Sequence, residues 1–154
     1  MIPLEANDPF YTKAIAEHRE LLQLVAGVEE KLAAALGDEE APPDWQDLLC
    51  CLEGLLAHVR EHFAEEEAGG LLDEAASRLP RLGPQTTALE RQHAPLLRQL
   101  CAVVNQARTS GESEKHWHEV DREFRSFCKA LLAHEAAENQ IAEEAFKGGV
   151  ATPV

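Results

Sequence analysis

The sequence predicts an all-α protein, folded as an antiparallel up-down-up-down bundle of four long helices. Three observations predict this fold class. Apolar residues recur three and four positions apart through four long segments, no segment alternates as a strand would, and β-branched residues are sparse. The segments are roughly 26 to 35 residues long with short connections. Helices of this length fit a bundle better than a globin-like fold.

The first helix is expected over residues 9–36. Asp8 is a suitable N-cap, and Pro9 suits the first helical position because no intrahelical hydrogen bond is lost there. Gly37 follows the last apolar residue and opens a polar linker. The apolar face of this helix comprises Ile15, Leu21, Leu22, Val25, Val28, Leu32 and Leu36.

The second helix is expected over residues 44–68. Asp44 can cap its start, and Gly69 and Gly70 stop it. The next segment, residues 71–83, reads as a short connecting piece with one or two helical turns. The apolar face of the second helix comprises Leu48, Leu52, Leu55, Val59 and Phe63.

The third and fourth helices are expected over residues 84–109 and 113–147. Pro84 suits the start of the third helix, which ends before Gly111. Ser113 is a plausible cap for the fourth helix. Its apolar face comprises Trp117, Val120, Phe124, Phe127, Leu131 and Ile141.

Length and charge narrow the class of protein. The chain has 154 residues, close to the size of one domain, so we expect a single domain over 1–154. Its formal net charge of −14 would repel nucleic acid and anionic membrane surfaces. It contains neither a long apolar run nor the basic and apolar segments of a secretory signal. We therefore expect a cytoplasmic protein that binds neither nucleic acid nor membranes.

Four of the seven histidines fall one on each predicted helix, facing inward. The histidines of the second and fourth helices are each followed at i+4 by a glutamate, so each pair shares a helix face. Because every residue adds about 1.5 Å to a helix, antiparallel pairing brings all four histidines to one height, near one end of the bundle. The candidate metal ligands are His18, His62, Glu66, His93, His134 and Glu138.

This layer predicts a dinuclear metal site. A lone inward histidine is usually a hydrogen-bonded core residue, but two carboxylates buried beside four imidazoles would cost several kcal/mol unless cations neutralised them. Four imidazoles and two carboxylates are too many ligands for one tetrahedral zinc. They suit two octahedral first-row ions bridged by the carboxylates.

Several nearby residues are weaker candidates for a role in the metal site. His58 lies one turn before the histidine of the second helix, and we expect it to support a ligand or line a pocket, with direct ligation as the alternative. Tyr11 approaches the layer from its open end, as core packing or, alternatively, as a proton or electron donor. Glu65, Glu67 and Glu135 flank the ligand motifs and are expected on solvated faces, unless one supplies a further metal contact.

Four segments together resemble the hemerythrin-like HHE cation-binding domains, and the resemblance covers almost the whole chain. The segments are AEHRELL, HFAEEE, LERQHAPLL and HEAAEN. The resemblance is carried by the ordered set H, HxxxE, H, HxxxE on four helices. It implies the hemerythrin bundle and two iron ions, Fe2+ or Fe3+, with an oxo or hydroxo bridge as an option. By the same resemblance Glu66 and Glu138 bridge the ions, one ion is bound by His18 and His62, and the other is bound by His93 and His134.

The sequence departs from the oxygen-carrying members of this family at two places. Leu89 stands where they have a second histidine, one turn before His93, and Glu138 stands in place of an aspartate one residue further on. The longer glutamate can make up the change of register, but the missing imidazole leaves one iron short of a ligand. Water, hydroxide, a carboxylate such as Glu90, or a substrate would fill that position.

Three functions remain open on these residues. The first is a protein that binds or senses oxygen or nitric oxide through an open iron position. The second is a di-iron enzyme of peroxidase or oxidase type acting on peroxide or oxygen, and the third is an iron-handling protein whose ions mainly hold the helices together. Manganese and zinc are alternatives to iron, because His and Glu ligands accept each of these metals.

Overall fold

The computed structural model describes residues 8–37 and 43–148, which are helical throughout their regular parts and contain no strand. The prediction of an all-helical protein is therefore confirmed for the described residues. No helix among them combines the length and hydrophobicity needed to cross a membrane. The long helices are α1 (Pro9–Leu36), α2 (Trp45–Glu67), α5 (His93–Ser110) and α6 (Glu114–Glu143), and the shorter ones are α3 (Leu71–Arg78), η2 (Pro80–Leu82), α4 (Gly83–Arg91) and the π-helical turn η3 (Glu144–Gly148).

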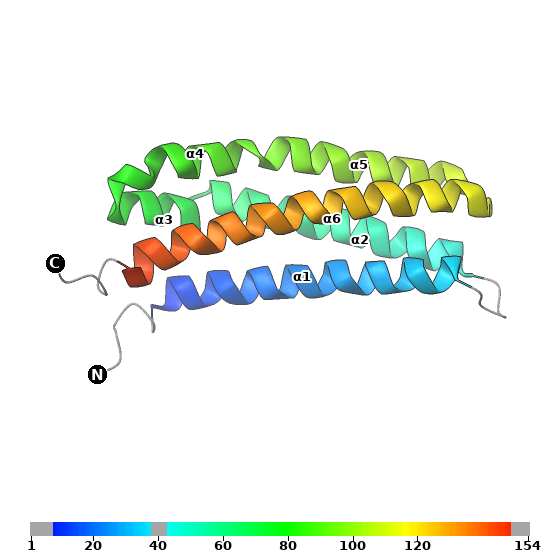
Figure 1. The fold of residues 1–154 in the computed structure, drawn as a ribbon, viewed down its shortest axis with the longest axis horizontal. Coiled ribbons are helices and arrows are strands. Elements are labelled where there is room, and N and C mark those ends of the chain that lie inside the picture. The colour runs from blue at the N-terminus through cyan, green and yellow to red at the C-terminus, as the bar shows by residue number, and fades with distance from the viewer. Residues whose placement is uncertain (1–7, 38–42, 149–154) are drawn as a thin grey trace.

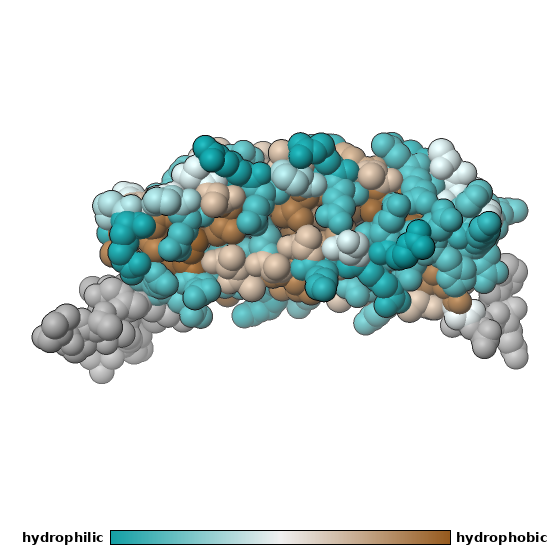
Figure 2. Space-filling model, turned by 45° about the horizontal axis from the view of Figure 1, so that its top comes forward, coloured by the Kyte–Doolittle hydropathy of each residue, from teal (hydrophilic) through white to brown (hydrophobic). Residues whose placement is uncertain are grey.

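The long helices lie side by side as a bundle. Helix α1 packs against α2 and α6, and α5 packs against the same two helices. Helices α3 and α4 lie at the end of the bundle where α1 begins and α6 ends (Figure 1). Polar side chains cover most of the face shown in Figure 2, with strips of apolar residues between them.

The helix starts follow the capping residues. The Asp8 carboxylate accepts a hydrogen bond from the Phe10 amide at 2.8 Å, and Asp44 accepts one from the Asp47 amide at 3.0 Å. Ser113 caps α6 in the same way. Because each cap satisfies an amide that lacks an intrahelical partner, these side chains fix where the helices begin.

The segment expected as one third helix is divided in two. Helix α4 ends at Arg91 and α5 begins at His93, with Gln92 between them. The Gln92 amide bonds to the carbonyl of Leu89 at 3.0 Å, a tight i−3 turn. Pro95 is the physical reason, because it has no amide hydrogen to give to the carbonyl four residues earlier. The break lies next to a candidate metal ligand.

Two apolar clusters fill the bundle, one on each side of a polar layer. On α1, Ala14 belongs to the smaller cluster and Leu21 to the larger, and His18 lies between them. On α6, Leu131 belongs to the larger cluster and Ile141 to the smaller. We call the larger cluster, which extends between α1, α2, α5 and α6, the long core. The short core consists of Tyr11, Ala14, Leu71, Leu72, Ala75, Leu82, Leu89, Ile141, Ala142, Ala145 and Phe146.

Candidate metal centre

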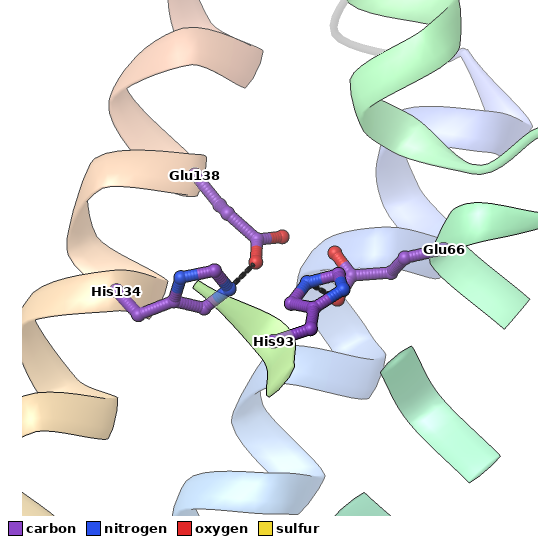
Figure 3. A group of neighbouring side chains, drawn as sticks. All are labelled: Glu66, His93, His134 and Glu138. Carbon is purple, nitrogen blue, oxygen red and sulfur yellow. Dashed lines mark ion pairs between the residues drawn. The ribbon is translucent and has the colours of Figure 1, made fainter. Parts of the chain in front are cut away.

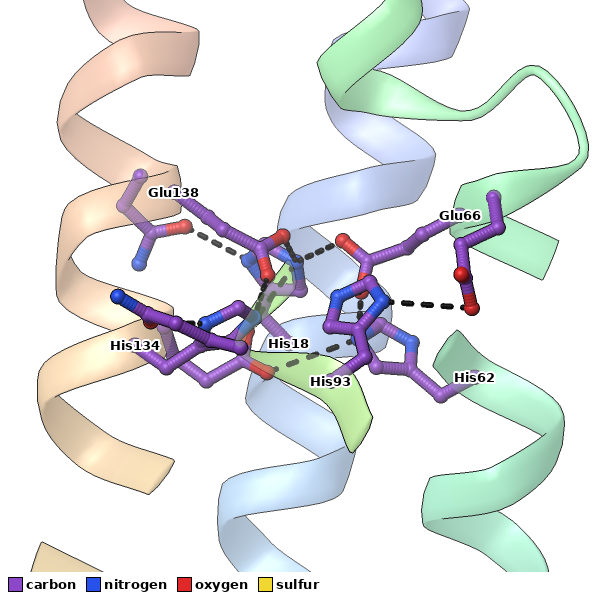
Figure 4. A network of polar contacts seen from close by, with 10 residues as sticks. His18, His62, Glu66, His93, His134 and Glu138 are labelled. Carbon is purple, nitrogen blue, oxygen red and sulfur yellow. Dashed lines mark hydrogen bonds and ion pairs between the residues drawn. The ribbon is translucent and has the colours of Figure 1, made fainter. Parts of the chain in front are cut away.

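The structure brings all six predicted ligands into the polar layer between the two cores (Figures 3 and 4). Each of these side chains is 5% exposed or less. Helix α1 supplies His18, α2 supplies His62 and Glu66, the first turn of α5 supplies His93, and α6 supplies His134 and Glu138. The height argument made from the sequence therefore holds, because the rise per residue is the same in all four long helices.

The potential ligand atoms fall into three overlapping groups, each with its atoms within 4.8 Å of one another. The groups overlap at the two carboxylates predicted to bridge, and at one imidazole. Overlap of this kind fits two neighbouring ion positions rather than one. The groups are Glu66, His93, His134 and Glu138; His18, His62 and Glu66; and His18, Glu135 and Glu138.

Glu66 lies between imidazoles of different helices. Its Oε1 atom is 3.2 Å from His62 Nε2 and 3.5 Å from His93 Nε2. Glu138 is placed similarly, with its carboxylate 3.4 Å from His18 Nε2 and also in contact with His134 Nε2. Each carboxylate thus spans from one side of the layer to the other, as a bridging ligand must.

Glu135 belongs to the layer as well, which corrects the expectation that it lies on a solvated face. Its side chain is 1% exposed, with Oε2 3.2 Å from His18 Nε2 and Oε1 3.6 Å from His62 Nε2. Helix α6 packs against α1, α3, α4 and α5, so its buried face is wider than an ordinary amphipathic stripe. The available signal was its position three residues before Glu138, on the same side of the helix.

Two amide side chains orient the imidazoles, and sequence reasoning missed both. His18 Nδ1 lies 2.7 Å from Asn139 Oδ1, and His134 Nδ1 lies 2.8 Å from Gln92 Oε1 (Figure 4). An amide oxygen only accepts, so each Nδ1 carries a hydrogen, and each Nε2 is the ring nitrogen directed into the layer. Glu67 takes a similar but longer position, 3.5 Å from His93 Nδ1.

The layer concentrates unsatisfied polar atoms. Apart from Gln106 Oε1, every buried side-chain nitrogen or oxygen without a hydrogen-bond partner among the described residues belongs to the layer. A deprotonated imidazole nitrogen and a carboxylate oxygen are both acceptors, so without an added proton or cation neither can donate to the other. A proton or a metal cation between them supplies the missing positive charge. The atoms are His62 Nε2, His93 Nδ1 and Nε2, His134 Nε2, and both carboxylate oxygens of Glu66, Glu135 and Glu138.

The pKa values of side chains in the layer also indicate that it needs positive charge. Burial, followed by the carboxylates of Glu138 and Glu135, raises the pKa of Glu66 to about 12. Burial opposes a charge on His18, yet Glu138 and Glu135 raise its pKa to about 9. Burial also opposes ionisation of Glu138, but the imidazoles of His134 and His18 hold its pKa below the usual range. Metal cations would compete with these protons for the same atoms.

The other predicted site residues lie outside the three ligand groups. His58 is half-buried and lines a surface pocket together with His62. Tyr11 packs in the short core with its ring 5.6 Å from that of Phe146, in agreement with the core interpretation. Glu90 does not reach the layer: burial and then the neighbouring Asp73 carboxylate raise its pKa, so its partner is another acid.

The remaining flanking positions agree with expectation. Glu65 and Glu67 are exposed, and Leu89 is buried in the short core one turn before His93. With a leucine there, the α4–α5 segment brings a single imidazole to the layer.

A pocket of about 200 Å³ connects the layer with the surface between α1 and α2. His18, His62 and Glu66 form its inner end. Its outer part is lined by Phe10, Lys13, Ala14, Glu17, Glu65, Gly69, Gly70 and Leu71. A small molecule can therefore approach the imidazoles of α1 and α2 from outside.

No model of a protein family matches the sequence, and neither a curated protein nor a solved structure matches the chain. The conclusion about the site therefore rests on its own geometry. The protein contains a buried cluster of His and Glu side chains whose donor atoms could hold metal ions.

Proposed function

We propose that the protein binds two metal ions in this layer. One ion is held by His93 and His134, and the other by His18, His62 and Glu135. Glu66 and Glu138 bridge the two. The observation that carries the proposal is the burial of three carboxylates against four imidazoles. None of the carboxylate oxygens has a hydrogen-bond partner, and neither do the facing nitrogens of three of the imidazoles, those of His62, His93 and His134. Without cations that arrangement would cost several kcal/mol in desolvated, repelling charge.

We infer further that the metal is iron and that the chain is a single hemerythrin-like domain with the antiparallel up-down-up-down order. The support is the resemblance of the ordered ligand motifs, together with helices that deliver those ligands in the expected sequence from α1 to α6. Mixed nitrogen and oxygen donors suit iron, and they also accept manganese and zinc.

The proposed activity is binding or sensing of a small ligand such as oxygen, nitric oxide or peroxide. His18, His62, Glu135 and the two shared carboxylates would offer five ligands to an ion here, one fewer than an octahedral set. The pocket between α1 and α2 opens onto this ion, and its volume suits a diatomic molecule or a peroxide rather than a bulky organic substrate. Bound iron would supply the Lewis acidity and the electrons for such a ligand.

The other half of the layer would offer fewer protein ligands. The Phe63 ring stacks on His93 there, with 4.0 Å between ring centroids, and Leu89 lies buried one turn before that histidine. The pocket between α1 and α2 is lined by His18 and His62 and by neither His93 nor His134. We place the exogenous ligand on the ion of His18 and His62.

Metal analysis combined with optical spectroscopy tests this function. We expect two ions per chain, and a spectral change when the anaerobic reduced protein meets nitric oxide, azide or air. Turnover of peroxide would instead assign the peroxidase or oxidase alternative. Rapid oxidation without ligand binding would assign iron handling, and a chain that binds no metal would contradict the proposal as a whole.

A further inference from the structure

A second pocket opens on the same face of the bundle, beside the first. It encloses about 170 Å³ between α1 and α2 and shares three lining residues with the first pocket. Two glutamates of α1, three positions apart, line one side of it, and glutamates and histidines of α2 that recur three and four positions apart line the other. The pocket, called here the acidic vestibule, is lined by Glu17, Glu20, His58, Glu61, His62 and Glu65.

The two openings differ in charge. The first pocket is lined partly by apolar residues and by Lys13, whose ammonium group lies 3.7 Å from the Glu17 carboxylate. The acidic vestibule has no lysine or arginine in its lining. Glu20, Glu61 and Glu65 form no salt bridge with any described residue, so their charges are not neutralised by the protein. A cleft lined by one sign of charge concentrates ions of the other sign.

The most buried residue that lines the vestibule, His62, is a candidate metal ligand. His62 is 5% exposed, its Nε2 atom has no hydrogen-bond partner, and that atom lies 3.2 Å from Glu66 Oε1. Glu66 is itself buried, and neither of its carboxylate oxygens has a hydrogen-bond partner. An ion that reaches His62 is therefore already in contact with the layer.

We propose that the acidic vestibule is the entry route for divalent cations into the metal centre. Glu20 and Glu61 attract the hydrated ion at the exposed rim, and Glu17, Glu65 and His58 replace part of its water shell. His62 then binds the ion and passes it to Glu66. The inference rests on the proposed metal centre. It assigns different routes to two kinds of solute: cations enter through the vestibule, and the small exogenous ligand enters through the pocket beside Lys13.

The test measures how fast the metal-free chain takes up Co²⁺, followed by visible absorption in a stopped-flow instrument over a range of ionic strengths. The variant Glu20→Gln/Glu61→Gln removes two rim charges without touching a proposed ligand. We expect its uptake to be roughly three- to tenfold slower than wild type at low ionic strength. The two rates should converge at high salt, with the same number of ions bound at saturation.

The control variant Glu112→Gln/Glu123→Gln makes the same change in net charge at exposed positions, one in the turn before α6 and one in the first half of that helix, and it should load like wild type. Equal rates for wild type and the rim variant would overturn the entry route, as would equal slowing by the control. Faster uptake by Lys13→Gln, with no effect of the rim variant, would assign entry to the first pocket. Failure of wild type to bind Co²⁺ at all would contradict the metal centre itself.

Discussion

The two halves of the candidate metal centre differ in how they are enclosed. Around His93 and His134, the Phe63 ring packs on both imidazoles, and the only carboxylates that share their ligand group are Glu66 and Glu138. Around His18 and His62, Glu135 adds a carboxylate and a pocket reaches the surface. We refer to these as the closed half and the open half. If both halves bind ions as proposed, we expect the closed half to retain its ion and the open half to exchange ligands as well.

Removing both ions should have the largest effect, because it affects both halves together. A ligand present at 1,000 times its dissociation constant contributes about 4 kcal/mol to stability. Two such sites contribute about 8 kcal/mol, so for a chain of this size we expect the melting temperature to fall by about 20 °C. Calorimetry with and without a chelator, followed by metal addition to restore the transition, measures this. An unchanged melting curve would show that the layer is not a metal site.

Loss of a bridging carboxylate should affect both halves. Glu66→Ala and Glu138→Ala each remove a ligand shared by the two ions, so we expect one ion per chain or none. Glu143→Ala is the matched control, because its side chain is exposed on the same helix as Glu138 and belongs to none of the three ligand groups. Metal content after dialysis distinguishes these outcomes, and two ions retained in Glu138→Ala would rule out a bridging role.

Loss of Glu135 should affect the open half alone. Its carboxylate contacts only the imidazoles of His18 and His62 among the histidines. In Glu135→Ala we expect the closed half to keep its ion and the open half to bind weakly, which titration with Co²⁺ would resolve as two steps. Simultaneous loss of both ions would mean that the halves are not separable.

The orienting amides allow a matched comparison of the halves. Gln92→Ala frees the imidazole of His134 in the closed half, and Asn139→Ala frees that of His18 in the open half. Removal of such a partner typically costs 10- to 100-fold in metal affinity. We expect each variant to weaken one ion only, while the exposed neighbour Gln140→Ala changes neither. Weakening of the same ion by both variants would contradict the assignment.

The smallest effect is expected from adding a ligand to the closed half. Leu89→His would place an imidazole one turn before His93, and should slow metal loss to a chelator if the ring fits without overpacking. Nitric oxide or azide binding should change less than about twofold, because those ligands bind in the open half. Leu89→Met controls for the change in packing. A large change in ligand affinity with Leu89→His would place the exogenous ligand in the closed half.

Much of the site could be predicted from the sequence because helices have a constant rise and a constant angular period. Capping residues such as Asp44 and Ser113 mark helix ends from which the heights are counted, and the i+4 spacing places Glu66 beside His62. Positions that depend on packing were harder. Glu135 is buried because α6 is enclosed by four other helices, and single-helix periodicity does not contain that information.

The two amide partners of the histidines depend on a local break in a helix and on a contact between helices distant in sequence. Gln92 reaches His134 from the break between α4 and α5, and Pro95 was the one signal of that break. Asn139 lies beside a predicted ligand but bonds to a helix far away in sequence. Glu90 was expected near the layer on its helix position, yet it pairs with Asp73 of α3, a helix whose placement the sequence does not specify.

The division into a long and a short core has a consequence for cooperativity. The short core is built from the start of α1, the end of α6 and the brief helices between α2 and α5, so it buries little surface of its own. A polar layer full of repelling carboxylates would decouple it from the rest of the bundle. Backbone amides at that end would then exchange with solvent through local opening, well below the free energy of global unfolding. Two ions tying four helices together would fuse both cores into one folding unit.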